Sequence, residues 1–155
     1  MTDLDDLIAP GAVLANVPAS SKKAVLTTLG ATAAARWGLA PRAVVDALAK
    51  REKLGSTGFG GGVAIPHARL EEVDRVHGAF LQLARPVDFD AVDDQPVDLV
   101  FMLLSPARGS ADHLKALARV SRRLREPNLA AKLRGAGSAD ALYALLASVD
   151  SRDAA

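Results

Sequence analysis

Residues 51–69 read Arg-Glu-Lys-Leu-Gly-Ser-Thr-Gly-Phe-Gly-Gly-Gly-Val-Ala-Ile-Pro-His-Ala-Arg, and they separate helical patterns before them from strand patterns after them. Five glycines stand within residues 55–62, where they leave little side-chain bulk and allow the backbone to approach a ligand closely. The apolar residues 63–65 predict a brief buried strand, and Pro66 keeps Ile65 extended. We therefore expect a loop rich in free N–H groups beside a histidine, His67, at the end of a strand.

Two helices are predicted before this stretch. Ser20 or Ser21 is a suitable N-cap for the first, apolar residues recur at helical spacing as far as Trp37, and Gly38 supplies a stop. Pro41 suits the first turn of the second helix, which should end within residues 51–54. A short edge strand is predicted over residues 12–15, ahead of both helices.

Strand patterns follow the glycine-rich stretch. Residues 76–84 alternate imperfectly between apolar and polar and predict one strand, and residues 87–89 are a candidate for brief pairing. Residues 97–104 form the most apolar run of the chain, between Pro96 and Pro106, which predicts a central strand buried on both faces. The charged residues 69–74 predict a bend between the histidine and these strands.

Three helices are predicted in the C-terminal part. Ser110 is the expected cap of a long one, and the other two begin at Pro127 and Ser138. Helices, then strands, then helices predict an α/β sandwich in which helices cover a small mixed sheet. We expect one domain over residues 1–155, with residues 1–10 and 150–155 poorly ordered. The inward seam of the long helix should consist of Leu114, Leu117, Ser121 and Leu124, with Val120 beside it.

Composition limits the classes of function. With 155 residues, 24% of them charged, and a net charge of +1, the chain has no overall attraction for nucleic acid or acidic lipid. The absence of cysteine excludes disulfides, thiol catalysis and cysteine-ligated zinc. The acidic N-terminus does not look like a signal peptide and no apolar run is long enough to cross a bilayer. We therefore expect a cytoplasmic protein that binds no nucleic acid and does not insert into membranes.

The glycine-rich loop does not match the nucleotide-binding loops. Gly55 and Gly60 have the separation found in a phosphate-binding P-loop, but Gly61 stands where that loop requires a lysine. The glycine spacing of a dinucleotide-binding fingerprint is absent as well. Two interpretations remain open, a nest of N–H groups that binds an anion and a flexible tight turn between a helix and a strand.

His67 and His113 are the candidate catalytic residues. A neutral imidazole is a competent nucleophile near physiological pH, and the loop, the small Ala68 and the cation Arg69 favour phosphoryl transfer at His67 over a purely structural role. His113 stands near the start of the long helix, where N–H groups favour an anion; the alternative is a partly buried packing residue. His77 has no polar neighbours in its strand and is assigned no role.

Metal binding and serine hydrolysis are not predicted. The three histidines lack short ligand spacing, no carboxylate falls at a recognised offset, and no Gly-x-Ser-x-Gly elbow occurs. We therefore expect no metal and no cofactor. The basic residues of the long helix either dock an acidic partner or simply form a solvated face, and these are Arg119, Arg122, Arg123 and Arg125.

As a whole, residues 51–69 resemble the active-site signature of the type 2 (fructose/mannitol) IIA domains of the bacterial phosphotransferase system. Within that family the chain is most similar to the nitrogen-regulatory IIA proteins, and the similarity extends to residues 20–23 and 112–117. The resemblance implies a mixed β-sheet with helices on both sides. It also implies that His67 accepts a phosphoryl group which His113 and Arg51 stabilise. We expect the loop to bind phosphate through Ser56, Thr57, Gly58 and Gly60.

The function implied by the resemblance is that of a phosphohistidine carrier, a phosphotransferase-type enzyme supplied by a small histidine-containing phosphocarrier protein. Two hypotheses of different class follow. In the first, the protein is a regulator whose binding to partners, such as kinases or ion transporters, depends on its phosphorylation. In the second, it is a sugar-specific IIA component that passes the phosphoryl group to a IIB domain for fructose/mannitol-type uptake. The lack of a fused membrane domain in this sequence favours the regulatory branch.

Overall fold

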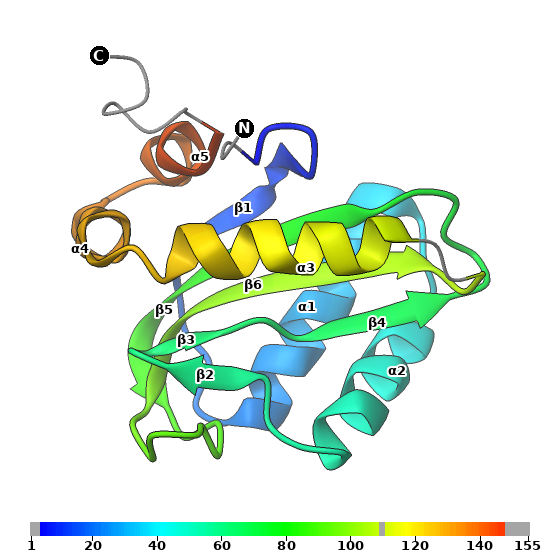
Figure 1. Ribbon diagram of the computed structural model, residues 1–155, viewed down its shortest axis with the longest axis horizontal. Coiled ribbons are helices and arrows are strands. Elements are labelled where there is room, and N and C mark those ends of the chain that lie inside the picture. The colour runs from blue at the N-terminus through cyan, green and yellow to red at the C-terminus, as the bar shows by residue number, and fades with distance from the viewer. Residues whose placement is uncertain (1–3, 109–110, 148–155) are drawn as a thin grey trace.

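The structure, a computed structural model, describes residues 4–108 and 111–147. The helices are α1 (Lys22–Trp37), α2 (Pro41–Lys53), α3 (Ala111–Leu124), α4 (Pro127–Gly135) and α5 (Ala139–Ala147). The strands are β1 (Ile8–Val17), β2 (Gly58–Gly60), β3 (Val63–Ala64), β4 (His67–Leu70), β5 (His77–Val87) and β6 (Val97–Pro106). Figure 1 shows α3 crossing one face of the sheet, with α1 and α2 on the other.

The described strands form one mixed sheet in the order β1-β5-β6-β3-β2, with β4 paired to β6 beyond β3. β1 is parallel to β5, and both β3 and β4 are parallel to β6, whereas the β5–β6 and β2–β3 pairs are antiparallel. Within β6, all residues are buried except Asp98 and Pro106, which are partly exposed. The predicted mixed sheet, its helices on both sides and its buried central strand are therefore confirmed.

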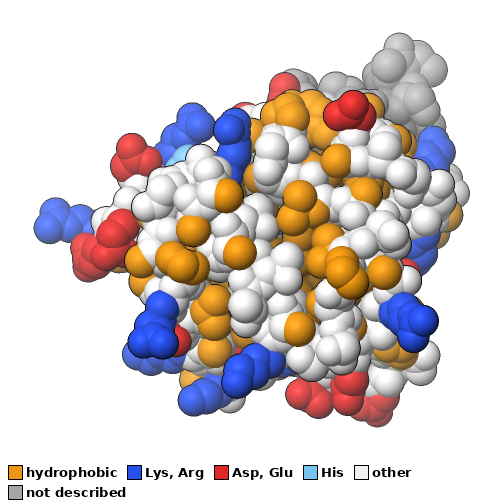
Figure 2. Space-filling view, turned by 180° about the vertical axis from the view of Figure 1, so that it is seen from behind, with side chains coloured by type: hydrophobic (Ala, Val, Ile, Leu, Met, Phe, Trp, Pro, Cys, Tyr) orange, Lys and Arg blue, Asp and Glu red, His pale blue; other side chains and the backbone are white. Residues whose placement is uncertain are grey.

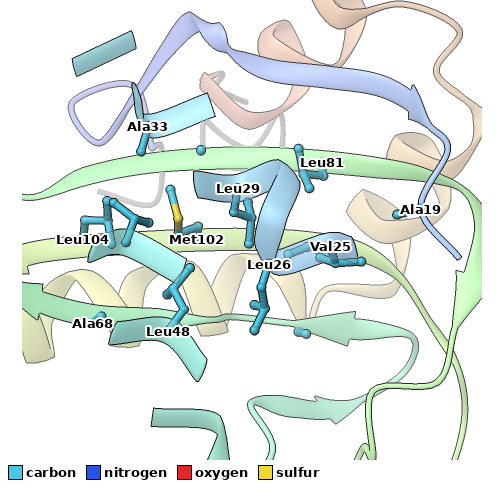
Figure 3. Close-up of a cluster of buried hydrophobic side chains, with 14 of the residues drawn as sticks. Ala19, Val25, Leu26, Leu29, Ala33, Leu48, Ala68, Leu81, Met102 and Leu104 are labelled. Carbon is cyan, nitrogen blue, oxygen red and sulfur yellow. The ribbon is translucent and has the colours of Figure 1, made fainter. Parts of the chain in front are cut away.

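One hydrophobic core lies between the sheet and the pair α1 and α2. Figure 3 shows Leu26 and Leu29 of α1 and Leu48 of α2 in one cluster with Met102 and Leu104 of β6. Fully burying one such side chain stabilises the fold by roughly 1.5–3 kcal/mol. Figure 2 shows this side of the molecule from behind, where apolar side chains are scattered and the charged side chains lie mostly at the margins.

The ends of these two helices agree with the sequence signals. Ser21 is the N-cap of α1, and its hydroxyl accepts a hydrogen bond from the backbone N–H of Ala24 at 3.1 Å. Gly38 follows α1 with a φ of 69°, a left-handed conformation that residues with a side chain rarely adopt. Pro41 begins α2, where its missing N–H is not needed.

The second core lies between the other face of the sheet and α3, α4 and α5. Phe80 of β5 and Phe101 of β6 meet edge to face with ring centroids 6.3 Å apart. Val120 of α3 and Leu142 of α5 are fully buried in the same cluster. This second layer places α3 over β6, with its first turn near the end of that strand.

The inward face of α3 agrees only in part with the predicted seam, since Val120 and Leu124 are buried and Leu117 packs against the core. Leu114 is 64% exposed, and the buried positions are His113, Ala116, Val120, Arg123 and Leu124. The prediction took Leu114 to point inward. Successive residues of a helix are about 100° apart, and the neighbouring His113 occupies the inward position instead. Ser110, the predicted cap, lies outside the described residues.

Several predicted boundaries require correction. β1 is longer than the expected residues 12–15, and residues 8–10, expected to be poorly ordered, are part of it. Leu4 is fully buried as well, while residues 1–3 and 150–155 lie outside the described part of the chain. β2 and β4 were not predicted, because β2 is mostly glycine and both strands depend on pairing with a neighbouring strand. Arg69 and Leu70, expected in a bend, belong to β4. In the described ranges, no helix is long and apolar enough to span a membrane.

Candidate active site

His67 stands where the edge of the sheet is interrupted. β3 pairs with β6 at Leu99 and Val100, and β4 resumes the parallel pairing at Leu103, opposite His67. Between the two strands, the carbonyl of Pro66 accepts a hydrogen bond from the N–H of Leu103 at 3.0 Å. His67 is therefore fixed at the first position of a strand but remains partly exposed at the sheet edge.

The His67 ring is held through one nitrogen. Its Nδ1 atom lies 2.8 Å from the carbonyl oxygen of Ile65, which can only accept a hydrogen bond. Nδ1 therefore carries the hydrogen, and Nε2 of the neutral ring carries the lone pair. Burial lowers the pKa of His67 below its usual 6.5, and the charge of Arg51 lowers it further. The hydrogen bond to the Ile65 carbonyl and the charge of Glu52 raise this pKa, but they do not outweigh the lowering effects. The neutral, nucleophilic form is thus favoured at neutral pH.

His113 faces His67 from the first turn of α3. The two ring centroids are 5.5 Å apart and the ring planes are tilted by 51°. His113 is only 6% exposed, and its Nδ1 atom lies 2.6 Å from Oγ of Ser105. Burial, the charge of Arg69 and His67 together lower the pKa of His113 to about 4. His113 is therefore a neutral polar group that can donate a hydrogen bond.

Strand register explains why these side chains meet. In the β4–β6 pair, His67 is opposite Leu103 and Arg69 is opposite Ser105. Because side chains alternate along a strand, these four residues lie on the face that α3 covers, whereas Ala68 belongs to the core beneath α1 and α2. The sequence places a cation at Arg69, and the fold brings it to the second histidine.

Arg51 approaches from the last turn of α2. Its Nη1 atom donates a hydrogen bond to the carbonyl of Gly55 at 2.9 Å, which leaves the other nitrogen atoms of the guanidinium available. Its positive charge contributes to the lowered pKa of His67. The predicted trio of His67, His113 and Arg51 is thus arranged around one end of the sheet.

The loop that follows α2 is fixed by a buried carboxylate. Glu52 is 8% exposed and accepts hydrogen bonds from the N–H and the hydroxyl of Thr57, the former at 3.1 Å. Lys22 of α1 forms an ion pair with Glu52 at 2.9 Å. The hydroxyl of Ser56 donates to the carbonyl of Phe89 at 2.5 Å and accepts from an N–H of the same loop. Both hydroxyls that we expected to bind phosphate therefore have internal partners.

The last three glycines of the stretch form the reverse turn between β2 and β3. Gly60, Gly61 and Gly62 have φ values of 111°, 68° and 81°, which only glycine adopts readily. Gly60 pairs with Val63, which in turn pairs with Leu99 of β6. His67 pairs with Leu103, four residues further along β6. At about 3.3 Å per residue, Gly60 and His67 are therefore separated by roughly 13 Å along the strand direction. The structure does not bring Gly60 to the histidine.

A polar network holds this turn from both sides. Arg134 of α4 donates to Asp98 at 2.8 and 2.9 Å and to the carbonyl of Gly61 at 2.6 Å. Asp93 accepts from the N–H of Gly61 at 3.0 Å. The Asp93 carboxylate also lies 3.4 Å from the position of a Cβ atom on Gly60, which makes this end of the loop unfavourable for an anion. Residues 60–62 therefore form a tight turn, although it joins two strands and not a helix and a strand as the sequence suggested.

His77 lies away from the two facing histidines, at the start of β5. Its ring stacks on Trp37 with a centroid distance of 4.7 Å, on the side of the sheet covered by α1. Within residues 4–108 and 111–147, no group of three or more histidine or carboxylate side chains could hold a metal ion. The sequence assigned His77 no role, and its position gives no reason to add one.

Sequence reasoning missed Ser105 and Glu52 as members of the site. Ser105 is 1% exposed near the end of β6, one residue beyond the apolar run for which the sequence predicted a strand. A hydroxyl directly after eight mainly apolar residues could have indicated a buried polar position. Glu52 stood next to the predicted Arg51, but nothing local indicated that it would be buried against Lys22.

Comparison with known proteins identifies the family of this arrangement. The family model described as "Phosphoenolpyruvate-dependent sugar phosphotransferase system, EIIA 2" matches residues 6–149. A nitrogen regulatory protein of Bradyrhizobium diazoefficiens is 50% identical over 144 residues, which cover 93% of this chain and 94% of that protein. The residues that the family model matches span the glycine-rich stretch and both facing histidines.

Solved structures show the same fold. The crystal structure of nitrogen regulatory protein IIA-Ntr from Neisseria meningitidis superposes with a TM-score of 0.86 at 34% identity, covering 92% of this chain and 98% of that one. The mannitol enzyme IIA of Escherichia coli, solved in complex with phosphorylated mannitol enzyme IIB, has a TM-score of 0.76 at 22% identity, with coverages of 91% and 99%. At that lower identity the likeness concerns the fold.

Proposed function

The chain belongs to the EIIA 2 family of the phosphoenolpyruvate-dependent sugar phosphotransferase system, and we propose that it is a phosphohistidine carrier with a regulatory role. In this proposal His67 accepts a phosphoryl group from a histidine-phosphorylated carrier protein, and the phosphorylation state then determines which partners the chain binds. The observation that carries the proposal is the pair of facing imidazoles, each with its Nδ1 atom bound elsewhere and its Nε2 atom free of hydrogen bonds to described residues.

Nε2 of His67 is the proposed attacking atom. Its lone pair forms the new P–N bond while the P–N bond to the donor imidazole breaks, and that electron pair returns to the donor nitrogen. The hydrogen on Nδ1 of His67 stays in its bond to the Ile65 carbonyl throughout, so no proton has to move. The lowered pKa of His67 supports this role, because a protonated imidazole has no lone pair to donate.

The surrounding groups suit the charge of the transferring phosphoryl group. Phosphoryl transfer depends mainly on positioning and on compensation of negative charge spread over three oxygens. Arg51 and Arg69 bring positive charge to His67 and His113 respectively, and neutral His113 offers an N–H donor. Two cations and one neutral donor can provide this compensation without a metal ion.

Two exposed leucines that adjoin site residues in the sequence support a protein partner. Leu54, three residues after Arg51, is 83% exposed, and Leu114, directly after His113, is 64% exposed. Exposed leucines are common singly, but two that adjoin catalytic candidates in sequence suit a docking surface. We infer that a small histidine-containing phosphocarrier protein contacts both leucines while its own phosphohistidine reaches His67.

The regulatory branch is the function that we favour over sugar transport. Its support is the 50% identity, over 93% of the chain, to a protein named for nitrogen regulation. In this branch the phosphorylated and unphosphorylated forms bind different target proteins, such as kinases or ion transporters. The alternative, transfer to a IIB domain of fructose/mannitol-type uptake, is supported by the sugar phosphotransferase family and by the likeness to a IIA protein solved with its IIB partner.

Phosphotransfer to purified protein tests the proposal. The chain is incubated with phosphorylated carrier protein, and the phosphorylated residue is located by mass spectrometry under alkaline conditions. We expect one phosphoryl group on His67, no labelling of His67→Gln, and full labelling of His77→Gln as the matched control. Labelling of His67→Gln at the wild-type level would refute the assignment of the acceptor.

A second reaction separates the two branches. Phosphorylated protein is mixed with a purified fructose- or mannitol-specific IIB domain, and the phosphoryl group on each protein is followed with time. We expect negligible transfer to IIB if the chain is a regulator. Rapid and complete transfer would instead support the sugar-specific alternative.

A further inference from the structure

The hydroxyl of Ser105 is buried against the second histidine of the site. Ser105 is 1% exposed near the end of β6, and its Oγ atom lies 2.6 Å from Nδ1 of His113. His113 itself is 6% exposed. No other described residue makes a hydrogen bond to either side chain. The two groups must therefore satisfy one another.

Hydrogen-bond balance decides which of the two atoms donates. A neutral imidazole carries one hydrogen, on either Nδ1 or Nε2, and a hydroxyl can donate or accept. If Nδ1 of His113 donated, the buried hydroxyl hydrogen of Ser105 would have no acceptor among the described residues, which is unfavourable. If Ser105 donates, the hydroxyl and Nδ1 are both satisfied, and the imidazole hydrogen is on Nε2.

We propose that Ser105 is a positioning residue that sets the tautomer and the orientation of His113, so that the N–H at Nε2 is presented to the phosphoryl group on His67. The inference rests on the proposed function, because it concerns how the same site stabilises its phosphoryl group. In the opposite tautomer, His113 would present a lone pair to the phosphoryl oxygens, which are themselves acceptors. By fixing the tautomer, Ser105 makes His113 a hydrogen-bond donor that stabilises the phosphoryl group and not an acceptor that repels it.

The charges around His113 are consistent with this arrangement. Ser105 can donate to Nδ1 only while the ring is neutral, because a protonated imidazole carries hydrogens on both nitrogens. Arg69 is opposite Ser105 in the β4–β6 register, and its positive charge disfavours a second positive charge on His113. The residues that face His113 from β4 therefore act in the same direction as Ser105.

Nitrogen-15 NMR of the unphosphorylated protein tests the tautomer directly. At neutral pH we expect His113 to show a protonated Nε2 and an unprotonated, hydrogen-bonded Nδ1. In Ser105→Ala and Ser105→Cys the two His113 nitrogen signals should move toward averaged values, since no strong donor remains, while those of His67 stay unchanged. A protonated Nδ1 on His113 in the wild type would overturn the proposal.

Transfer rates test the consequence for the reaction. We expect Ser105→Ala and Ser105→Cys to accept the phosphoryl group roughly tenfold more slowly, the effect of losing about one hydrogen bond. Ser105→Thr, which keeps the hydroxyl, should restore most of the rate. In a His113→Gln background, Ser105→Ala should have no further effect, because its proposed target is gone.

Two outcomes would overturn the role of Ser105, namely a wild-type rate for Ser105→Ala or an equal effect of Ser105→Ala with and without His113. Thermal melting of each variant shows that it is folded, and Ser105→Cys repeats the test at nearly constant side-chain volume. Failure of the proposed function looks different. In that case wild-type His67 would not be labelled at all, while the NMR result on the unphosphorylated protein would still stand.

Discussion

The imidazole rings of His67 and His113 lie with their centroids 5.5 Å apart and their planes tilted by 51°. Each ring is held at Nδ1, His67 by the Ile65 carbonyl and His113 by the Ser105 hydroxyl. The two Nε2 atoms are the ring nitrogens that remain for a reaction. One lone pair and one N–H donor on facing rings can hold a phosphoryl group between them.

The rate of phosphoryl transfer should depend on pH through His67. Burial lowers the pKa of His67 below 6.5, so the neutral form persists to lower pH than in a free histidine. We expect the transfer rate to fall with decreasing pH as the ring becomes protonated, with a midpoint below the pH 6.5 of a free histidine. NMR titration of the His67 ring should give the same pKa. A midpoint at or above pH 6.5 would contradict this prediction.

Arg51 should affect both the rate and the pKa of His67. Its charge lowers that pKa, so Arg51→Gln should raise it while slowing transfer by roughly tenfold to a hundredfold through lost charge compensation. Arg42→Gln removes an exposed cation from the opposite end of α2 and serves as the control. An equal loss of rate in both variants would show that general electrostatic attraction of the carrier is responsible.

The stability of the protein should decrease in acid because of His113. Its pKa is about 4 in the folded state and near 6.5 when unfolded, so between these values only the unfolded chain takes up the proton. The free energy of unfolding should therefore fall as the pH decreases from 6.5 to 4, by at most about 3 kcal/mol from this residue.

Urea unfolding at several pH values measures this effect. His113→Gln cannot titrate, so its free energy of unfolding should vary less with pH than that of the wild type over the same interval. Identical pH dependence in the two proteins would mean that His113 does not contribute.

Glu52 should contribute strongly to stability. Its buried carboxylate joins Lys22 of α1 to Thr57 in the loop beside the site. Glu52→Gln leaves Lys22 without its counter-charge and should cost roughly 3 kcal/mol in the free energy of unfolding, whereas exposed Glu71→Gln should cost little. The double variant Lys22→Met, Glu52→Gln should be more stable than Glu52→Gln alone. A strictly additive double variant would contradict coupling between the two charges.

The sequence predicted the parts of this site that depend on local signals. His67 follows a buried strand and a proline, and Arg51 ends a helix with a clear start at Pro41, so both could be placed from their neighbours in the chain. The contact between Ser105 and His113 could not, because it depends on how α3 packs over the end of β6. The rotation of α3 was wrong for a related reason, since an apolar residue on a helix need not face the core, as exposed Leu114 shows.

The glycines show where a sequence pattern supports two structures equally. An anion nest and a tight turn both require glycine, and residue types alone cannot separate them. Only the pairing of β2 with β3, and the contacts of Arg134 and Asp93 with Gly61, show that this end of the stretch is a turn. The position of His67 at the end of a buried segment was therefore predicted correctly, while Gly60 of the expected phosphate loop lies away from it.

Two adjacent glycines offer a matched test of this interpretation. Gly61 and Gly62 both have positive φ values, of 68° and 81°, so alanine at either position should cost about 1–2 kcal/mol in backbone strain. A Cβ atom on Gly61 meets nothing within 4 Å, whereas one on Gly62 would collide with Nη2 of Arg134 and lie 2.9 Å from Oδ1 of Asp98. Gly62→Ala should therefore destabilise the protein clearly more than Gly61→Ala. If these residues only form a turn, both folded variants should accept the phosphoryl group at the wild-type rate. A slow but fully folded Gly61→Ala would instead show that the turn takes part in binding phosphate.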